Sequence, residues 1–545
     1  MNADHEGAGL LTRIFHIWSA ITLIAITAAL TFYFNQGYYE LGEEKFRIFI
    51  RVSLMVLPVW AVLGLICLIK LRRDIDPAST VKSISATGWF MILLAISGII
   101  STLTSDYRDV SFMGFDGWHM GLAVQLLMMV FAIVAYFLFS RGEKLILYIT
   151  GTVFLLITAV AFVLGVMNRF SIYPLHMWGQ ADDFISTLGN INWFCGYWCI
   201  WTGIGCGLFL YAQKIYTKIL LGIYVWICAV TGVCCGADAC YLAWGVISIA
   251  GLLWALSSSA GMIRLCTMEI LMFTSLPTIA LIGALRPNRM WYDSAWLRGV
   301  CYEDKWIMPY IIAMIVLSVL TEVFRRRDRD RSAFRPLICG AMIGSAVAVV
   351  MIIILNSSIE GGIWPVRGRS IFTWSIGWGS GRGGIWTVCV RLIKSLFPLK
   401  IFFGVGCDAL CSYAYSDDEI VLMLNRYIGN QYLTNAHNEL LSIIINEGIL
   451  GAFAYFGIQF SHMAGCIRMI SKDEVSSETE TSAAQQTSGA CSDPVNACLL
   501  GALLAAAAYM AVGIVGFMQI LSTPFLFMII GMASGLIKRT NIPII

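Results

Sequence analysis

Charged residues are scarce in this chain of 545 residues: Asp, Glu, Lys and Arg make up only 13% of it, against about 25% in a soluble domain. Hydrophobic residues make up 59%, and the mean hydropathy is +0.78, so the composition excludes a soluble globular protein. The net charge of +3 is too small to indicate a nucleic-acid partner. Segments of alternating hydrophobicity, which a membrane β-barrel needs, are also missing. The chain is therefore expected to lie in a membrane as helices.

Metal-binding spacings are absent as well, although the chain has 17 cysteines. None of the cysteines shows a spacing typical of a zinc site. Most of them lie inside apolar runs, where cysteine behaves as a small hydrophobic residue. The sequence predicts no metal and no cofactor. Cys407 and Cys411 lie in a predicted outer loop and could pair.

Long apolar runs recur along the whole chain, and each has the roughly 20 residues that cross about 30 Å of hydrocarbon as a helix. We predict an all-α polytopic membrane protein with about 14 transmembrane helices, the last one centred near Phe527. Basic connections such as KLRRDIDPASTVK and FRRRDRDRSAFR fall on one side, which the positive-inside rule assigns to the cytoplasm. Both termini are then cytoplasmic, in a multi-pass protein of the cell (plasma or inner) membrane.

The predicted organisation has three parts. Residues 1–355 form a transmembrane bundle of about 11 helices, and residues 437–545 add about three more. Between them, residues 356–436 form a large extracellular or periplasmic loop domain, and so long a loop usually carries function. Residues 471–495 are rich in Ser, Thr and Ala without apolar periodicity, which predicts a disordered cytoplasmic loop.

The large outer loop carries arginines in a Gly- and Trp-rich stretch. Arg367, Arg369 and Arg382 lie there, and the planar fork of arginine suits phosphate because it offers paired donors and stays charged. The glycines that flank Arg382 allow close approach of a ligand, and the segment after it suits a helix in the membrane interface. We predict a phosphate site here. The alternative is that these arginines bind lipid head groups.

The stretch YLTNAHNELLSIIINEGILGAFAY (432–455) begins a long apolar helix with three polar residues, His437, Asn438 and Glu439. Ionisable residues at membrane depth are costly and are functional candidates. We therefore predict that His437 is a base or proton-positioning group that faces the arginines. The alternative is that the three residues only cap the helix.

The same stretch has a predicted packing face. At about 100° per residue, Gly448 and Gly451 share a face with His437, and the two glycines would let a neighbouring helix pack closely. Glu447 lies two to three turns deeper than His437. An unpaired carboxylate would be costly at that depth, so we predict that Glu447 forms hydrogen bonds with neighbouring helices.

Three motifs resemble the O-antigen ligase and O-antigen polymerase superfamily of membrane glycosyltransferases. FISTLGNINWFCGYW (184–198), which includes Asn190 and Asn192, is similar to the family's Gly-Asn-x-Asn entry into a span. SGRGGIWTVCVRLIKSLFPLKIFFGVG (380–406) is similar to its outer-loop pattern of SGR, Ile-Trp, Pro and Gly-Val-Gly. AHNELLSIIINEGILGAFAYFG (436–457) is similar to its His-Asn pair followed by Glu-Gly-x-x-Gly. The motifs span about half of the chain, and the first five helices match only as generic spans.

The resemblance implies a GT-C-like fold. It also implies that a glycan moves on the outer membrane face from an undecaprenyl-diphosphate carrier to an acceptor hydroxyl, without metal or nucleotide. His437 would match the family's essential histidine, and Arg382 its diphosphate-contacting arginine. The acceptor would be a glycan, a lipid or a protein, with membrane lipids as the other partners. Further residues expected to bind substrate are Arg367, Arg369, Asn438, Glu439, Asn190, Asn192 and Asp238.

One position departs from the family pattern. Where the family commonly has Ser-Arg-Gly, this chain reads TGVCCGADACYLAW (231–244), with Asp238 near the expected arginine. Because a carboxylate cannot bind diphosphate, Arg367, Arg369 or an arginine of residues 286–305 would supply the second positive charge, or the substrate differs. Asp238 would instead orient an arginine, bind a sugar hydroxyl or cap a helix.

Three other functions stay open. A peptidoglycan-type lipid-linked polymerase would use an outer carboxylate, Asp238 or Asp408. A polysaccharide or lipid transporter would need coupling carboxylates or broken helices near the midplane, whereas the predicted spans hold almost no ionisable residue apart from Glu269. A non-enzymatic glycan-export partner would tolerate the loss of both Arg382 and His437.

Overall fold

The computed structural model describes residues 2–70, 83–181, 183–287, 289–290, 295–326, 330–359, 362–363, 366, 369–429, 432–481 and 494–540. The helices are α1 (Asn2–Phe32), α2 (Leu41–Lys70), α4 (Ala86–Thr104), α5 (Arg108–Met113), α6 (Leu122–Arg141), α7 (Lys144–Arg169), α8 (Ile191–Tyr211), α9 (Ile215–Cys235), α10 (Asp238–Ala255), α11 (Ser259–Phe273), α12 (Ser275–Leu285), α13 (Ala295–Tyr302), α14 (Ile307–Arg326), α15 (Arg335–Ser358), α16 (Arg382–Ser395), α17 (Lys400–Phe403), α18 (Leu410–Ala414), α19 (Asp418–Ile428), α20 (Glu439–Thr481), α21 (Pro494–Gly513) and α22 (Thr523–Thr540). Three short 3₁₀ turns, η2 (Asp304–Trp306), η3 (Ser332–Phe334) and η4 (Ser370–Phe372), and one antiparallel pair of strands, β1 (Phe184–Ile185) and β2 (Gly189–Asn190), complete the described elements.

Thirteen helical segments among the described residues are long and apolar enough to cross a membrane, which confirms a many-span, all-α membrane protein. Eleven of them precede the large outer loop and two follow it. The fourteenth predicted span, near Phe527, is not among them: α22 has only 18 residues and ends in Lys538 and Arg539. It packs alongside α6 within the bundle.

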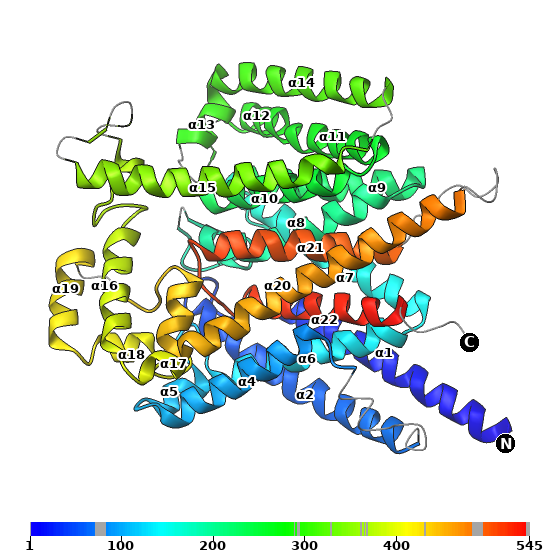
Figure 1. Cartoon of the computed structure of the whole chain (residues 1–545), viewed down its shortest axis with the longest axis horizontal. Coiled ribbons are helices and arrows are strands. Elements are labelled where there is room, and N and C mark those ends of the chain that lie inside the picture. The colour runs from blue at the N-terminus through cyan, green and yellow to red at the C-terminus, as the bar shows by residue number, and fades with distance from the viewer. Residues whose placement is uncertain are drawn as a thin grey trace.

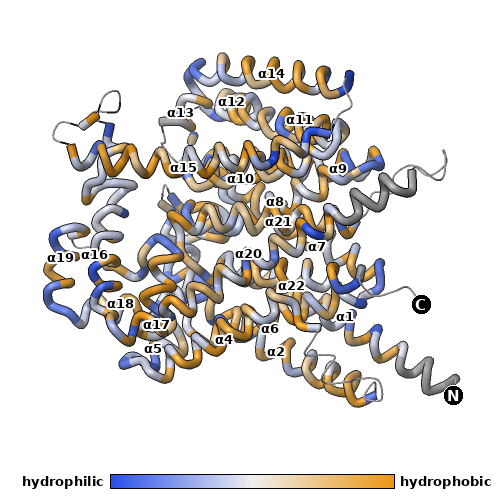
Figure 2. The backbone as a smooth tube through the Cα atoms, viewed as in Figure 1, coloured by the Kyte–Doolittle hydropathy of each residue, from blue (hydrophilic) through white to orange (hydrophobic). Residues whose placement is uncertain are grey.

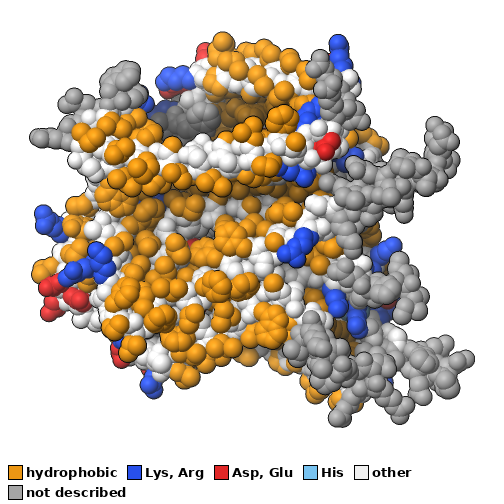
Figure 3. Space-filling view, in the orientation of Figure 1, with side chains coloured by type: hydrophobic (Ala, Val, Ile, Leu, Met, Phe, Trp, Pro, Cys, Tyr) orange, Lys and Arg blue, Asp and Glu red, His pale blue; other side chains and the backbone are white. Residues whose placement is uncertain are grey.

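The spans lie roughly side by side, and their hydrophobic residues fill the middle of the molecule (Figures 1 and 2). On the face drawn in Figure 3, charged side chains gather toward the two ends of these helices, and the surface between them is mostly hydrophobic. Both termini lie at one end, while α16 to α19 lie at the opposite end (Figure 1). The predicted topology requires this separation. Which end faces the cytoplasm stays a prediction.

The innermost helix is α8, of which 89% of the span is buried. It packs closely against α21 because small residues face each other along both helices. A Cβ atom on Gly207 would lie 2.2 Å from the Gly501 nitrogen, and one on Gly203 would lie 2.5 Å from the Ala505 nitrogen. Small residues of this kind let two membrane helices approach backbone to backbone. The start of α8 and the end of α21 therefore lie next to each other, where the candidate site is found.

The loop domain begins after α15 ends at Ser358 and leads into α20 at Glu439. The helix predicted after Arg382 is present as α16, and it runs across the direction of the spans (Figure 1). Its apolar side, with Val388 and Leu392, packs into a small core with α19 and the start of α20. Cys407 and Cys411 are both free thiols, so the considered pairing does not form. The domain is a folded cap on the bundle.

Helix α20 is broken at Gly448, whose backbone angles of φ 73° and ψ −173° are not helical. A close neighbour at Gly448 was predicted and is present, but it is the one-turn helix α17 and the loop that follows it, not another span. The Val405 N–H donates to the Ile445 carbonyl (3.0 Å) and the Gly406 N–H donates to the Asn446 carbonyl (2.9 Å). The loop therefore satisfies backbone carbonyls that the break leaves without a helical partner, as burial in a membrane protein requires.

We expect Gly448→Ala to lower the free energy of unfolding by at least about 1–3 kcal/mol, the cost of a strained backbone residue. A Cβ atom there would also lie 2.2 Å from the Phe402 carbonyl carbon. The control is Gly245→Ala in α10, where an added Cβ meets nothing within 4 Å. Thermal unfolding of both variants in detergent measures the difference. Equal midpoints would contradict the assigned backbone geometry.

Buried ionisable residues in the spans are more numerous than the sequence indicated. Glu269 accepts hydrogen bonds from Trp244 and Ser248, but the fully buried Lys45 also donates to two backbone carbonyls at the end of α1. Glu447 accepts a hydrogen bond from Gln125 Nε2 at 2.7 Å, which confirms its predicted bonding to a neighbouring helix. The prediction that the spans hold almost no ionisable residue apart from Glu269 is therefore wrong.

The loop predicted to be disordered, 471–495, begins inside α20, which continues as helix through Thr481. Residues 482–493 lie outside the described part of the chain, and their disorder stays a prediction.

Candidate functional site

His437 lies in a tight turn just before α20, not on the helix itself. Its φ of 47° is in the left-handed region, which is uncommon for a residue other than glycine. Asn435 Oδ1 accepts a hydrogen bond from the His437 N–H at 2.9 Å. The neighbouring carbonyl of Ala436 accepts one from Trp386 Nε1 of α16 at 3.1 Å. The turn is thus held from both sides, and strained backbone of this kind is often found at functional sites.

The imidazole of His437 packs edge-on against Phe517, with the ring centroids 5.5 Å apart and an interplanar angle of 89°. Phe517 in turn contacts Trp118. Burial and the nearby Arg382 guanidinium lower the pKa of His437 to about 4. The ring is therefore neutral at pH 7 and can accept a proton. Within the described part of the chain, no hydrogen bond occupies its ring nitrogens.

Arg382 is the first residue of α16, directly after the glycine-rich turn that the sequence singled out. Its Nη1 donates to the Gly379 carbonyl at 2.8 Å. Its buried Nε has no hydrogen-bond partner among the residues described. Burial lowers the pKa of Arg382, and the negative charge of Asp238 acts in the opposite direction. The guanidinium therefore keeps donors that could bind an anion.

Asp238, Arg382 and His437 come from three separate segments and form one electrostatic group. Asp238 lies exposed in the first turn of α10. Its charge acts on Arg382, and the charge of Arg382 acts on His437. No ion pair or hydrogen bond joins Asp238 to Arg382 among the described residues, so the role of Asp238 in orienting an arginine stays a prediction.

Asn438 and Glu439 are largely occupied by structural contacts. The Leu441 N–H donates to Asn438 Oδ1 at 3.0 Å, and Asn438 Nδ2 donates to the Ile514 carbonyl at 2.9 Å. Asn438 is therefore the cap of α20, and the capping interpretation holds for this residue. Glu439 is 2% exposed, and its carboxylate accepts a hydrogen bond from the Tyr455 hydroxyl at 3.1 Å.

The two asparagines of the Gly-Asn-x-Asn motif differ in position: Asn190 caps a helix, and Asn192 lies at the site. Asn190 Oδ1 accepts from the Asn192 N–H at 2.9 Å and thereby caps α8. The Asn190 amide nitrogen also contacts Asp183. Asn192 is exposed at the first turn of α8 and faces the recess that contains His437. Of the two asparagines, Asn192 is the one placed to meet a ligand.

The remaining predicted phosphate ligands are not brought to the site. Arg369 lies exposed just before η4, and no contact joins its side chain to Arg382 or His437 in the part of the chain the structure covers. Arg367 falls outside the described residues. Asp408, the outer carboxylate considered for a peptidoglycan-type enzyme, is half-buried and accepts hydrogen bonds from the N–H groups of Phe115 and Met120. Burial raises the pKa of Asp408 to about 6.

A narrow recess lies beside His437, with about 10 Å³ in which a water-sized sphere can be centred. This is room for about one water molecule, so a larger ligand would need the recess to widen. Its lining joins the start of α8, the start of α20 and the end of α21 to the segment before α22: Asn192, Gly196, His437, Glu439, Tyr509, Val512, Gly513, Val515, Gly516, Phe517, Gln519 and Ser522.

The segment 514–522 was missed by the sequence reasoning, although it supplies much of this recess. Gln519 Nε2 donates to the Trp193 carbonyl at 3.4 Å, whereas its buried Oε1 has no partner among the described residues. A buried polar atom without a partner is costly and calls for an explanation, and a ligand is one. The signal was present as Gln519 and Ser522 in an otherwise apolar connection.

Neither a known protein-family model nor a curated protein matches this chain. What is established is therefore a many-span, all-helical membrane protein with a recess at one end of its bundle.

Proposed function

We propose that this protein is a GT-C-like, metal-independent, inverting glycosyltransferase of the O-antigen ligase and polymerase type, with its active site on the outer face of the cell membrane. The observation that carries the proposal is the meeting of a neutral, strained His437 with Arg382, which keeps free donors, beside a recess. The three sequence motifs that resemble this superfamily support it.

In the proposed mechanism, Arg382 binds the diphosphate of an undecaprenyl-diphosphate-linked glycan and stabilises the negative charge that develops as it leaves. An acceptor hydroxyl attacks the anomeric carbon while the bond to the diphosphate oxygen breaks, so the configuration inverts. His437 takes the hydroxyl proton, which its neutral ring permits. In this proposal Asn192 and Gln519, which line the recess, bind sugar hydroxyls of the substrate.

The lipid-linked glycan profile of a strain that lacks the gene tests this function. Complementation with wild type should restore the profile, and His437→Ala should not. Build-up of single repeat units would indicate a polymerase, and build-up of long lipid-linked chains would indicate a ligase. An unchanged profile, or full rescue by His437→Ala, would contradict the proposal.

The pH dependence of transfer follows from the lowered pKa of His437. Because protonation removes the base only near its pKa of about 4, kcat/KM should stay level between pH 8 and about pH 5 and fall below that. An ordinary histidine would lose activity below about pH 6.5. Initial rates with a lipid-linked donor at low concentration measure the profile, and an acid limb between pH 6 and 7 would contradict the assignment.

A transport function is the second candidate, and the broken helix supports it. Helix α20 is interrupted at Gly448, and the adjacent Glu447 is fully buried with Oε2 unpartnered among the described residues. Broken helices and buried carboxylates are features of transporters. Reconstituted vesicles distinguish the two functions: movement of a lipid-linked glycan across the bilayer without glycosyl transfer would favour transport.

A further inference from the structure

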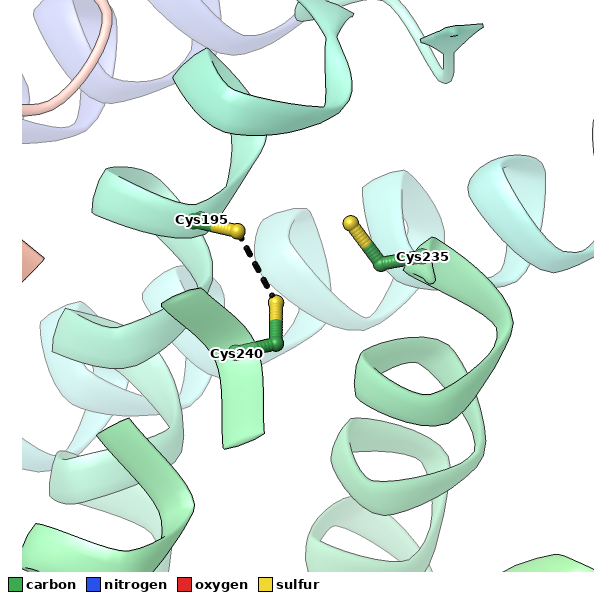
Figure 4. A group of neighbouring side chains, drawn as sticks. All are labelled: Cys195, Cys235 and Cys240. Carbon is green, nitrogen blue, oxygen red and sulfur yellow. Dashed lines mark hydrogen bonds between the residues drawn. The ribbon is translucent and has the colours of Figure 1, made fainter. Parts of the chain in front are cut away.

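Three cysteine side chains from three helices converge at the outer ends of α8, α9 and α10. Cys195 lies in the second turn of α8, Cys235 is the last residue of α9, and Cys240 lies in the first turn of α10. Their sulfur atoms all lie within 4.8 Å of one another, and those of Cys195 and Cys240 are 3.0 Å apart (Figure 4). All three residues are buried. No other group of three or more potential metal ligands converges in this way within the described ranges.

The backbone around the three thiols is firmly held. The turn between α9 and α10 passes through Gly236 in the left-handed region (φ 73°). The buried Arg169 donates from Nε to the Cys234 carbonyl and from Nη2 to the Cys235 carbonyl, each at 3.0 Å. The guanidinium also places a positive charge beside Cys235. The turn therefore presents two of the sulfurs in a fixed arrangement toward the third.

We propose that Cys195, Cys235 and Cys240 form a binding site for a thiophilic d¹⁰ metal ion, Cu⁺ or Zn²⁺. Thiolates are soft ligands, which select these ions. Three sulfurs bound at about 2.3 Å lie roughly 4 Å from one another. The three sulfurs here need to shift by only about 1 Å from their observed spacing to reach that arrangement.

Binding needs no redox step. Each thiol that binds as a thiolate releases one proton to solvent as its metal–sulfur bond forms, and the positive charge of Arg169 lies close enough to offset part of the resulting negative charge. Three sulfur ligands suit a three-coordinate Cu⁺, whereas structural zinc sites usually have four ligands. Among the described residues, no fourth His, Cys, Asp or Glu side chain joins this cluster.

A bound ion would link the outer ends of three helices next to the candidate site. Gly196, which lines the recess, follows Cys195 directly. Asp238, whose charge acts on Arg382, lies two positions before Cys240. The metal would therefore fix the position of this wall of the recess. The proposal does not depend on the reaction that the recess supports.

The test is metal content after loading the purified full-length protein with Cu⁺ under a reductant, or with Zn²⁺ in a parallel sample, followed by a wash with a competing chelator. We expect roughly one ion per chain for wild type, and loss of most of it in the variant Cys195→Ser/Cys235→Ser/Cys240→Ser. The matched control is Cys199→Ala, one turn further along α8. Cys199 is also buried, but its Sγ donates to the Gly196 carbonyl and lies outside the cluster.

X-ray absorption on the loaded wild-type protein gives a second readout that needs no variant. A shell of three sulfurs near 2.3 Å supports the site, and its metal edge distinguishes Cu⁺ from Zn²⁺. A shell of only nitrogen and oxygen, an equal metal content in the triple variant, or a Cys195–Cys240 disulfide in metal-free protein that cannot be loaded would each overturn the proposal.

Discussion

Replacement of His437 with alanine is expected to lower glycan transfer by about 10²- to 10⁴-fold, the usual contribution of general acid–base catalysis. The expectation rests on the neutral imidazole of His437, which the nearby Arg382 and burial maintain at pH 7. The substitution also removes the edge contact with Phe517, so the folded state has to be checked by size-exclusion chromatography and thermal unfolding.

The matched control is His176→Ala, because His176 is exposed in the connection before α8 and lies outside the recess. We expect this variant to keep wild-type transfer. Full activity of a correctly folded His437→Ala protein would remove His437 from the mechanism. The edge contact and the strained turn would then be structural features only.

The second large effect is expected at Arg382. Substitution with lysine keeps the positive charge but loses the planar fork that binds phosphate through paired donors, so we expect transfer to fall by at least about tenfold. The loss should appear mainly in kcat, because the bond to the departing diphosphate strengthens in the transition state. Kinetics with varied donor concentration separate the two constants.

The control lies on the same helix. Arg391 is exposed and pairs with Glu419 at 3.3 Å, so Arg391→Lys should leave transfer unchanged. Wild-type kinetics in Arg382→Lys would instead favour the interpretation that Arg382 binds lipid head groups. Asp238→Asn gives an intermediate case: if the carboxylate only orients Arg382, the variant should lose less activity than Arg382→Lys.

The sequence predicted what depends on local composition and periodicity. The apolar runs predicted the positions of all thirteen candidate spans, because about 20 consecutive apolar residues form a helix long enough to cross the bilayer. The helix after Arg382 was likewise predicted from its local pattern, whereas the outer location of the loop domain stays a prediction. The fourteenth predicted span, α22, is not among the thirteen candidates because Lys538 and Arg539 shorten its apolar run, and its crossing of the membrane stays a prediction.

Features that depend on contacts between segments far apart in the chain could not be predicted from local composition and periodicity. The sequence around Gly448 resembles that of a continuous helix. The break there is explained only by the inserted Val405–Gly406 backbone. The cysteine cluster joins residues from three helices, so no short spacing reveals it. The electrostatic effect of Asp238 on Arg382 likewise involves residues that are far apart in the chain.

Helix α16 carries a consequence for how the site would respond to motion. Arg382 begins this helix, and Trp386, one turn further, holds the Ala436 carbonyl next to His437. The turn of the histidine is also tied to the bundle, because Asn438 Nδ2 donates to the Ile514 carbonyl and Phe517 packs against the His437 ring. The position of Arg382 relative to His437 therefore depends on the Trp386 hydrogen bond, which joins the loop domain to the bundle. Loss of this hydrogen bond would free the arginine to move relative to the histidine.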